Sequence, residues 1–311
     1  MLKSIIPGLV FGLMLATGTT QAACTDHRVQ LQVLGSGGPE LDDGRASSSY
    51  LIWVDGKARV LVDAGGGSSA NFEKSGAKIE DLQAVLFSHF HVDHSGDFAA
   101  YVKASFFGPR VEDLPVFGPE GNDRMPSTGE FLATLLGKAG AYRYLSAYVE
   151  TDEPSDFNLV PHSVVLDSTE ATIFEVNEGL KVSAVPVHHG PIAALAWRVD
   201  IGHCAISFSG DMNNQTGHLS QLARGSQLLV AHNAIPEEAG GVARQLHMPP
   251  SEIGKIAKQA NVGKLLISHR MNRTLGEAEE AATRTEISKS YQGPVVFADD
   301  LQRIDIEEHK L

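Results

Sequence analysis

The chain has 311 residues, a formal net charge of −13 at pH 7 and a hydrophobic content of 42%. A protein with this charge repels nucleic acid and anionic membranes unless it carries a local basic patch. The composition is that of an ordinary globular protein, and it excludes a fibrous or low-complexity chain. We therefore expect a folded acidic protein with enough residues to bury a substantial core.

The N-terminal residues have the pattern of a secretion signal. Lys3 precedes an apolar run over residues 5–16, and small and polar residues follow it up to Ala22. The run is shorter than the roughly 20 apolar residues that a membrane-spanning helix needs, and the small residues suit signal cleavage. Residues 1–22 are therefore predicted to be a signal peptide of a periplasmic or secreted bacterial protein, and residues 23–311 to form a single domain.

Two cysteines remain after this cleavage, Cys24 and Cys204. Bacterial lipid-attachment sites usually carry Leu three positions before the cysteine, whereas this chain has Gln21, which argues against a lipid anchor at Cys24. In an oxidising compartment the two cysteines could form a disulfide. The sequence alone leaves open whether they pair or remain free.

Strands and helices are predicted to alternate along the domain. Apolar runs between glycine-rich turns predict strands, and apolar residues at helical spacing predict helices. The predicted strands lie within residues 28–35, 49–56, 58–67, 82–89, 171–176, 179–189, 193–200, 204–211, 226–232, 264–270 and 301–306. Helices are predicted within 97–107, 129–142 and 249–263, and again between the last two strands. The acidic segment 146–178 is predicted to be a loop with one or two strands. Two blocks of strands with helices between them favour two mixed β-sheets packed between helical layers.

A dense group of metal-binding side chains follows the strand 82–89. His89, His91, Asp93 and His94 form the pattern H-x-H-x-D-H. Neutral imidazole and carboxylate are the ligands that zinc and similar metals prefer. Ligand sites in open α/β sheets form at the carboxyl ends of strands, which is where this group lies. The pattern therefore favours a metal site over a solvated surface loop.

Three other strand ends carry further candidate ligands. One strand ends in His188 and His189, another is followed by Asp211, and a third by His269. Because the carboxyl ends of neighbouring strands can meet at one edge of a sheet, these side chains are expected near the first group.

The stretches "HFHVDH", "HHGP", "SGD" and "SHR", in this order, resemble the metallo-β-lactamase superfamily. Their details, together with "LGSGGP" at residues 34–39, resemble its ribonuclease Z and zinc-dependent arylsulfatase branches. The resemblance covers nearly all of residues 23–311. It implies one hydrolase domain with the four-layer αββα sandwich of two mixed β-sheets flanked by helices.

The resemblance also implies which residues hold two zinc ions, with manganese or iron as alternatives. His89, His91 and His189 would bind one ion, Asp93, His94 and His269 the other, and Asp211 would bridge them. His189 is chosen over His188 because the run that follows it resembles the family pattern, and His188 would then support a ligand. Asp63 matches a position that orients a ligand histidine, although it could also be a simple turn residue.

The implied reaction is hydrolysis by a hydroxide that bridges the two metals, oriented by Asp93. His247 precedes the helix 249–263 and is the candidate general acid, with an exposed loop histidine as the alternative. The negative charge and the absence of a basic arm argue against an RNA substrate. The predicted function is therefore hydrolysis of small sulfate or phosphate esters, as by an arylsulfatase or a phosphodiesterase.

Two alternatives remain open. A lactonase or β-lactamase would use the same metal centre on a cyclic ester or amide, and a metal-stabilised binding protein would use it without catalysis. The sequence predicts a small anionic ester as the substrate, no nucleic acid as a partner and no membrane span. It leaves open whether the chain forms a homodimer.

Overall fold

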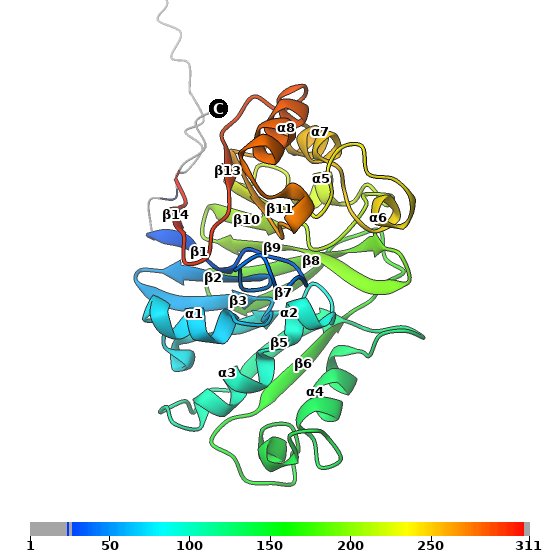
Figure 1. Ribbon diagram of the computed structural model, residues 1–311. Helices are drawn as coiled ribbons and strands as arrows, with labels where there is room; N and C mark the ends of the chain where they lie inside the picture. Colours follow the sequence, from blue (N-terminus) through cyan, green and yellow to red (C-terminus); the bar gives the residue numbers. More distant parts are fainter. Residues whose placement is uncertain (1–23, 25–26, 308–311) are drawn as a thin grey trace, which may run out of the picture.

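The computed structural model describes residue 24 and residues 27–307. Within them, fourteen strands form two seven-stranded sheets that lie face to face (Figure 1). The first sheet has the order β14 (Arg303–Asp305), β1 (Val29–Gly35), β2 (Ser49–Val54), β3 (Lys57–Val62), β4 (Ala84–Leu86), β5 (Leu114–Pro119), β6 (Leu159–Val164). The second has the order β13 (Val295–Phe297), β12 (Lys264–Ser268), β11 (Leu228–His232), β10 (Cys204–Phe208), β9 (Ile192–Ile201), β8 (Leu180–His189), β7 (Thr172–Asn177).

Both sheets are mixed. In the first, β14, β1, β2 and β3 pair antiparallel, and β3 to β6 pair parallel. In the second, β7 to β10 pair antiparallel, and β10 to β13 pair parallel. The parallel strands of each sheet therefore bring their carboxyl ends to a common edge, where loops can carry polar side chains.

Helices cover the outer face of each sheet (Figure 1). On the first sheet they are α1 (Ser68–Ser75), α2 (Val92–Ser95), α3 (Phe98–Ser105) and α4 (Thr128–Leu136), with the 3₁₀ turns η1 (Ile79–Asp81) and η2 (Arg143–Tyr148). On the second they are α5 (Leu219–Leu222), α6 (Gly241–Leu246), α7 (Pro250–Ala260) and α8 (Glu277–Ser288), with η3 (Asn272–Thr274).

Three apolar layers hold this arrangement together. The layer between the sheets contains Leu31 and Tyr50 from the first sheet and Trp197 and Phe208 from the second. A second layer packs α1, α3 and α4 on the first sheet, and a third packs α5, α7 and α8 on the second. Burial of these faces is the dominant favourable term in folding. The predicted αββα sandwich is thus confirmed.

The structure adds elements that the sequence pattern did not predict: the helices α1, α5 and α6 and the strands β5 and β13. The acidic segment 146–178 contains part of η2 and the strands β6 and β7. A helix was predicted within residues 97–107, but a separate helical turn, α2, already begins at Val92. Asp93 and His94 therefore lie on a short helix and not on an extended loop.

The predicted signal peptide, residues 1–22, lies outside the described residues. The part of the chain that the structure describes contains no helix long and apolar enough to cross a membrane. Cys24 and Cys204 form a disulfide, with their Cα atoms 5.2 Å apart. This pairing settles a question that the sequence left open.

Candidate metal centre

The predicted ligands converge at the edge where both sheets end their parallel strands. The H-x-H-x-D-H group follows β4 of the first sheet. His189 ends β8, Asp211 follows β10 and His269 follows β12, all in the second sheet. The centre therefore lies at the junction between the two sheets.

A first group of three histidines has its ring nitrogens close together. Nε2 of His89 lies 3.0 Å from Nδ1 of His91. One nitrogen from each of these rings and one from His189 all lie within 4.8 Å of one another. The other ring nitrogen of His189 bonds to the carbonyl oxygen of Leu246 at 2.9 Å, and this contact leaves its Nε2 directed at the centre. The three residues are those predicted to share one metal ion.

A second group contains Asp93, His94 and His269. Oδ2 of Asp93 lies 3.2 Å from Nε2 of His269 and 3.5 Å from Nε2 of His94. The rings of His94 and His269 stack with their centroids 5.2 Å apart. These side chains are almost fully buried. They are the residues predicted to hold the second ion.

The carboxylate of Asp211 lies between the two groups. Its Oδ2 is 3.8 Å from Nε2 of His189 in the first group. The same oxygen is 3.7 Å from Nε2 of His94 and 3.3 Å from Nε2 of His269 in the second. A single carboxylate thus faces nitrogens of both groups, as a ligand bridging two metal ions must.

These side chains fit divalent metal ions of the zinc type. The set consists of imidazole nitrogens and carboxylate oxygens, the donors that such ions prefer. Nε2 of His94 is buried and has no hydrogen-bond partner among the described residues. A buried polar atom without a partner costs free energy, and a metal ion would remove that cost.

The protonation states without metal agree with this fit. Burial lowers the pKa of His89 well below its usual range, so its imidazole is neutral. Burial alone would raise the pKa of Asp211, but the charge of His269 holds that pKa well below its usual range. Burial also disfavours charge on His94, yet Asp93 raises the pKa of His94 above its usual range. The ionised carboxylates therefore hold protons on nearby histidines, and bound metal ions would replace those protons.

Asp63 orients His94. Its carboxylate bonds to Nδ1 of His94 at 2.8 Å, and it also accepts hydrogen bonds from the backbone N–H and the hydroxyl of Ser88 at 2.7 and 2.8 Å. The bond fixes the proton of His94 on Nδ1 and leaves Nε2 free to face the centre. The structure thus gives Asp63 the contact that its predicted orienting role requires.

The backbone at the centre is shaped for these contacts. Asp63 and His269 adopt positive φ values of 56° and 51°, which are uncommon outside glycine. Such conformations persist where the surrounding structure holds them in place. Gly38 lies so close to His269 that a Cβ atom at this position would approach Cε1 of the ring to 2.9 Å. The glycine in the "LGSGGP" segment therefore lets this loop pass against a predicted ligand.

His232 supports the bridging position, although sequence reasoning did not fix its role. Its Nδ1 bonds to Oδ1 of Asp211 at 2.8 Å, and its Nε2 lies 3.1 Å from the hydroxyl of Tyr50. That hydroxyl also donates to Ser268. Both nitrogens of His232 are thus occupied, which makes it a support for Asp211. The sequence feature that could have pointed to this role is the position of His232 at the end of the buried strand β11.

His188, predicted to support the centre, lies further from it. Successive residues of a strand point to opposite faces, so His188 and His189 diverge. Nδ1 of His188 accepts a hydrogen bond from the amide of Asn213 at 2.9 Å. This side chain therefore bonds to the segment after Asp211, and among the described residues it has no hydrogen bond to a predicted ligand.

His247, the candidate general acid, lies within the centre. Its Nδ1 is 3.8 Å from Oδ2 of Asp211, and its ring centroid is 5.2 Å from that of His189. Nδ1 has no hydrogen-bond partner among the described residues. Burial lowers the pKa of His247 to about 4, and the charge of Arg273 adds to this effect. The ring is therefore neutral at pH 7 and has a nitrogen free to bind another group.

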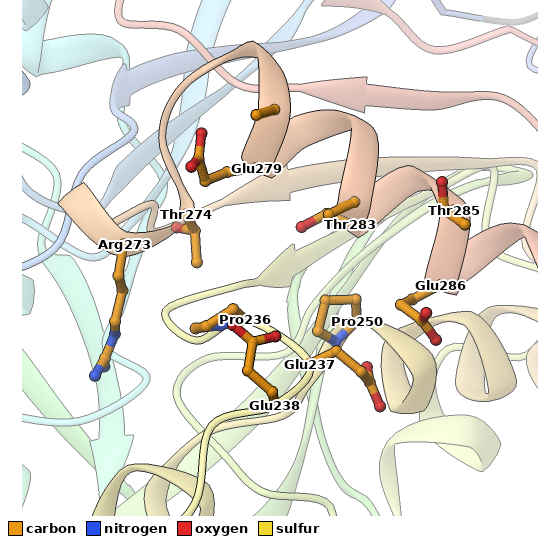
Figure 2. Close-up of a pocket in the computed structure, with 12 residues that line it drawn as sticks. Pro236, Glu237, Glu238, Pro250, Arg273, Thr274, Glu279, Thr283, Thr285 and Glu286 are labelled. Carbon is orange, nitrogen blue, oxygen red and sulfur yellow. The ribbon is translucent and has the colours of Figure 1, made fainter.

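A cavity of about 430 Å³ lies between α8, the start of α7 and the loop at Pro236 (Figure 2). Its charged lining residues are Glu237, Glu238, Glu279, Glu286 and Arg273. The guanidinium of Arg273 points away from the glutamates of α8 (Figure 2). None of the predicted ligands lines this acidic cavity, so it is separate from the metal centre.

A family model described as the metallo-beta-lactamase superfamily matches residues 42–248. The chain belongs to the metallo-β-lactamase superfamily. The match includes the H-x-H-x-D-H group, His189 and Asp211. It confirms the predicted family and shows that the protein is a hydrolase of this superfamily.

Related sequences and solved structures agree with the assignment of this chain to the metallo-β-lactamase superfamily. Ribonuclease Z from Mycolicibacterium paratuberculosis is 28% identical over 291 residues, which cover 90% of this chain and 99% of the relative. The metallo-β-lactamase fold protein YhfI from Bacillus subtilis has a TM-score of 0.69 at 20% identity and covers 90% of this chain and 99% of its own. The short form of human tRNase Z has a TM-score of 0.64 at 18% identity, with 89% and 99% covered. The predicted ribonuclease Z branch is supported by the sequence relative, and the solved structures share the fold.

Proposed function

We propose that this protein is an exported hydrolase of small phosphate or sulfate esters that works with two metal ions. The position of Asp211 between two groups of ligand-type side chains carries this proposal, because one carboxylate faces nitrogens of both groups. His89, His91 and His189 would hold one ion, and Asp93, His94 and His269 the other. Zinc is the first candidate, with manganese or iron as alternatives. Ions bound there would supply Lewis acidity and lower the pKa of bound water.

The protein's own residues would place the reacting groups. Asp93 presents an ionised carboxylate to the centre: burial alone would raise the pKa of Asp93, but His94 and His269 together lower that pKa below its usual range. Such a carboxylate can accept a hydrogen bond from the attacking water and orient it. Asp63 and His232 keep His94 and Asp211 in place through hydrogen bonds of 2.8 Å.

His247 is proposed to act on the leaving group. It is a largely buried histidine just before α7 whose Nδ1 has no hydrogen-bond partner among the described residues, and its ring lies beside His189 of one ligand group and His269 of the other. A hydrogen bond from this imidazole to the leaving oxygen would assist departure of an alcohol more than departure of an activated phenol. The positive charge of Arg273 acts on His247 and would favour an anionic substrate.

Phosphodiesters are the first substrate class to test. Relatives named ribonuclease Z support a phosphodiester, and the signal-like N-terminus and the Cys24–Cys204 disulfide support export. The net charge of −13 disfavours a long polyanion such as RNA, because RNA binding depends on neutralising many phosphates. A small diester makes no such demand.

Rates on bis(p-nitrophenyl) phosphate, p-nitrophenyl sulfate, a lactone and a precursor tRNA, with metal content measured on the same sample, would test the proposal. We expect two metal ions per chain and metal-dependent turnover of the diester or the sulfate. Asp211→Asn should lower turnover at least 100-fold, and the control Asp167→Asn, at an exposed position, should leave it unchanged. Faster cleavage of the tRNA or the lactone than of both small esters would overturn the substrate assignment.

The role of His247 has its own experiment. His247→Ala should slow a diester with an alkyl leaving group at least tenfold more than it slows bis(p-nitrophenyl) phosphate. His203→Ala, which removes an exposed histidine from the turn after β9, is the control. Equal slowing of both diesters would contradict a role in leaving-group departure and would indicate a role in binding.

A further inference from the structure

A second cavity lies on the outer face of the second sheet, away from the predicted metal ligands. Its volume is about 360 Å³, within the range of small-molecule pockets. The floor is formed by β8 and β9, where Lys181, Ser183 and Val185 alternate along β8 and so share one face. The helix α5 forms one wall, and because it has four residues it leaves this end of the sheet open.

The cavity is basic, although the protein as a whole is acidic. Its charged lining residues are Lys181, Arg198, Arg224 and Asp200, and the last of these is already paired with Arg198 at 2.8 Å. Glu175 lies opposite Lys181 on the edge strand β7, but it does not line the cavity. A net positive lining on a protein with a charge of −13 indicates a local preference for anions.

Arg198 is held in place and does not itself need a ligand. Its guanidinium bonds to Asp200 and to the carbonyl oxygens of Leu222 and Arg224. The residue thus ties β9 to the turn after α5 and fixes the position of Arg224. The cavity wall is therefore preformed.

Three polar groups of the cavity lack partners among the described residues, whereas His218 bonds to the carbonyl oxygen of Pro186. In the described part of the chain, neither the ammonium of Lys181 nor the guanidinium of Arg224 pairs with a carboxylate. The hydroxyl of Ser183, in a residue only 5% exposed, makes no hydrogen bond to a described residue. Three donors around one cavity are thus left for a ligand, and a tetrahedral oxyanion has enough acceptor oxygens for all of them.

We propose that this cavity binds a small organic monoester of phosphate or sulfate. The anionic group would bind Lys181, Arg224 and Ser183, and the organic part would pack on the apolar side chains of Val185 and Leu222. This site is distinct from the metal centre. On β8, Ser183 lies six residues before His189, which corresponds to about 20 Å along a strand.

Calorimetric titration of the metal-loaded protein with phenyl phosphate tests the proposal, with benzyl alcohol as the neutral probe. We expect a binding event that weakens with salt and that benzyl alcohol does not produce. In the double variant Lys181→Ala/Arg224→Ala the affinity of this event should fall at least tenfold, while turnover of bis(p-nitrophenyl) phosphate stays unchanged. The matched control is Lys57→Ala/Arg143→Ala, which removes one exposed lysine and one exposed arginine elsewhere.

Phenyl phosphate can also bind at the metal centre, so the number of sites must be measured. The proposal requires that the double variant loses one site and keeps the other, and that phenyl sulfate or inorganic phosphate competes for the lost site. Unchanged stoichiometry and affinity in a folded double variant, or equal losses in the control, would overturn it. Should the double variant fail to fold, Arg224→Glu at an exposed turn gives the same comparison.

Discussion

Replacing Asp63 by asparagine should weaken metal binding although Asp63 touches no metal. Asparagine tolerates the positive φ of 56° at this position, so the backbone is preserved. The carbonyl oxygen of the new side-chain amide can still accept from the backbone N–H of Ser88, but the NH₂ group of that amide then faces Nδ1 of His94. Two N–H groups cannot bond, so His94 must move its proton to Nε2. That nitrogen would then present a proton to the centre in place of a lone pair.

The size of the effect follows from the role of such supporting bonds. Loss of a residue that orients a ligand histidine typically costs 10–100-fold in metal affinity, or about 1.4–2.8 kcal/mol. Metal occupancy would be measured against a series of chelator-buffered zinc concentrations. Asp97→Asn is the matched control, because Asp97 likewise accepts bonds from a backbone N–H and a hydroxyl, both of Ser69, at 2.9 and 2.8 Å, and has no hydrogen bond to a histidine among the described residues. If Asp63→Asn binds zinc with the parent affinity, the tautomer argument is wrong.

Three further changes have defined outcomes. His91→Ala should reduce metal content by about one ion per chain, measured by elemental analysis, whereas His203→Ala should not; unchanged metal content would break the ligand assignment. In the metal-free protein His247 has a folded pKa of about 4, below its unfolded value of about 6.5, so its contribution to stability is lost as pH falls from 6.5 to 4. His247→Gln should therefore reduce the fall in the free energy of unfolding across this pH window by up to about 3 kcal/mol, measured by urea titration at each pH, and a parallel curve would contradict the assigned pKa. Reduction of the Cys24–Cys204 bond, which closes a 180-residue loop, should lower the free energy of unfolding by about 2–5 kcal/mol, and an unchanged urea midpoint would exclude that contribution.

Local sequence patterns predicted most of the long strands and helices, because their apolar residues form continuous runs or recur at helical spacing. Strands such as β8 and β10 stand out as apolar runs, and α7 as an amphipathic helix with Pro250 at its first turn. The short strand β13 was missed because its three residues carry too little pattern. The helix α6 was missed because none of its residues is buried. Both are held by the tertiary structure and not by their own composition.

Contacts between distant segments could not be read in the same way. The positions of His89 and His189 at strand ends predicted only that both lie near one edge of a sheet. That they would share one ion was implied by the family resemblance. The roles of His232 and Tyr50 depend on side-chain directions at strand ends, which a single sequence does not encode. The basic cavity near Lys181 was invisible for the same reason: its cationic residues come from three separate segments, and the net charge of the chain concealed them.

The two sheets are fastened to each other at opposite ends. Cys24 precedes β1 of the first sheet and bonds to Cys204 at the start of β10 in the second. Asp211, beyond the far end of β10, faces histidines that follow strands of both sheets, so bound metal ions would join the halves there, roughly 20 Å away. The disulfide, which needs an oxidising environment, and the metal ions would thus link the two sheets independently of each other. In an environment that is both reducing and poor in metal, the two sheets would be held together only by their apolar interface and by hydrogen bonds such as those of Tyr50 with Ser268 and of Trp197 with Phe87.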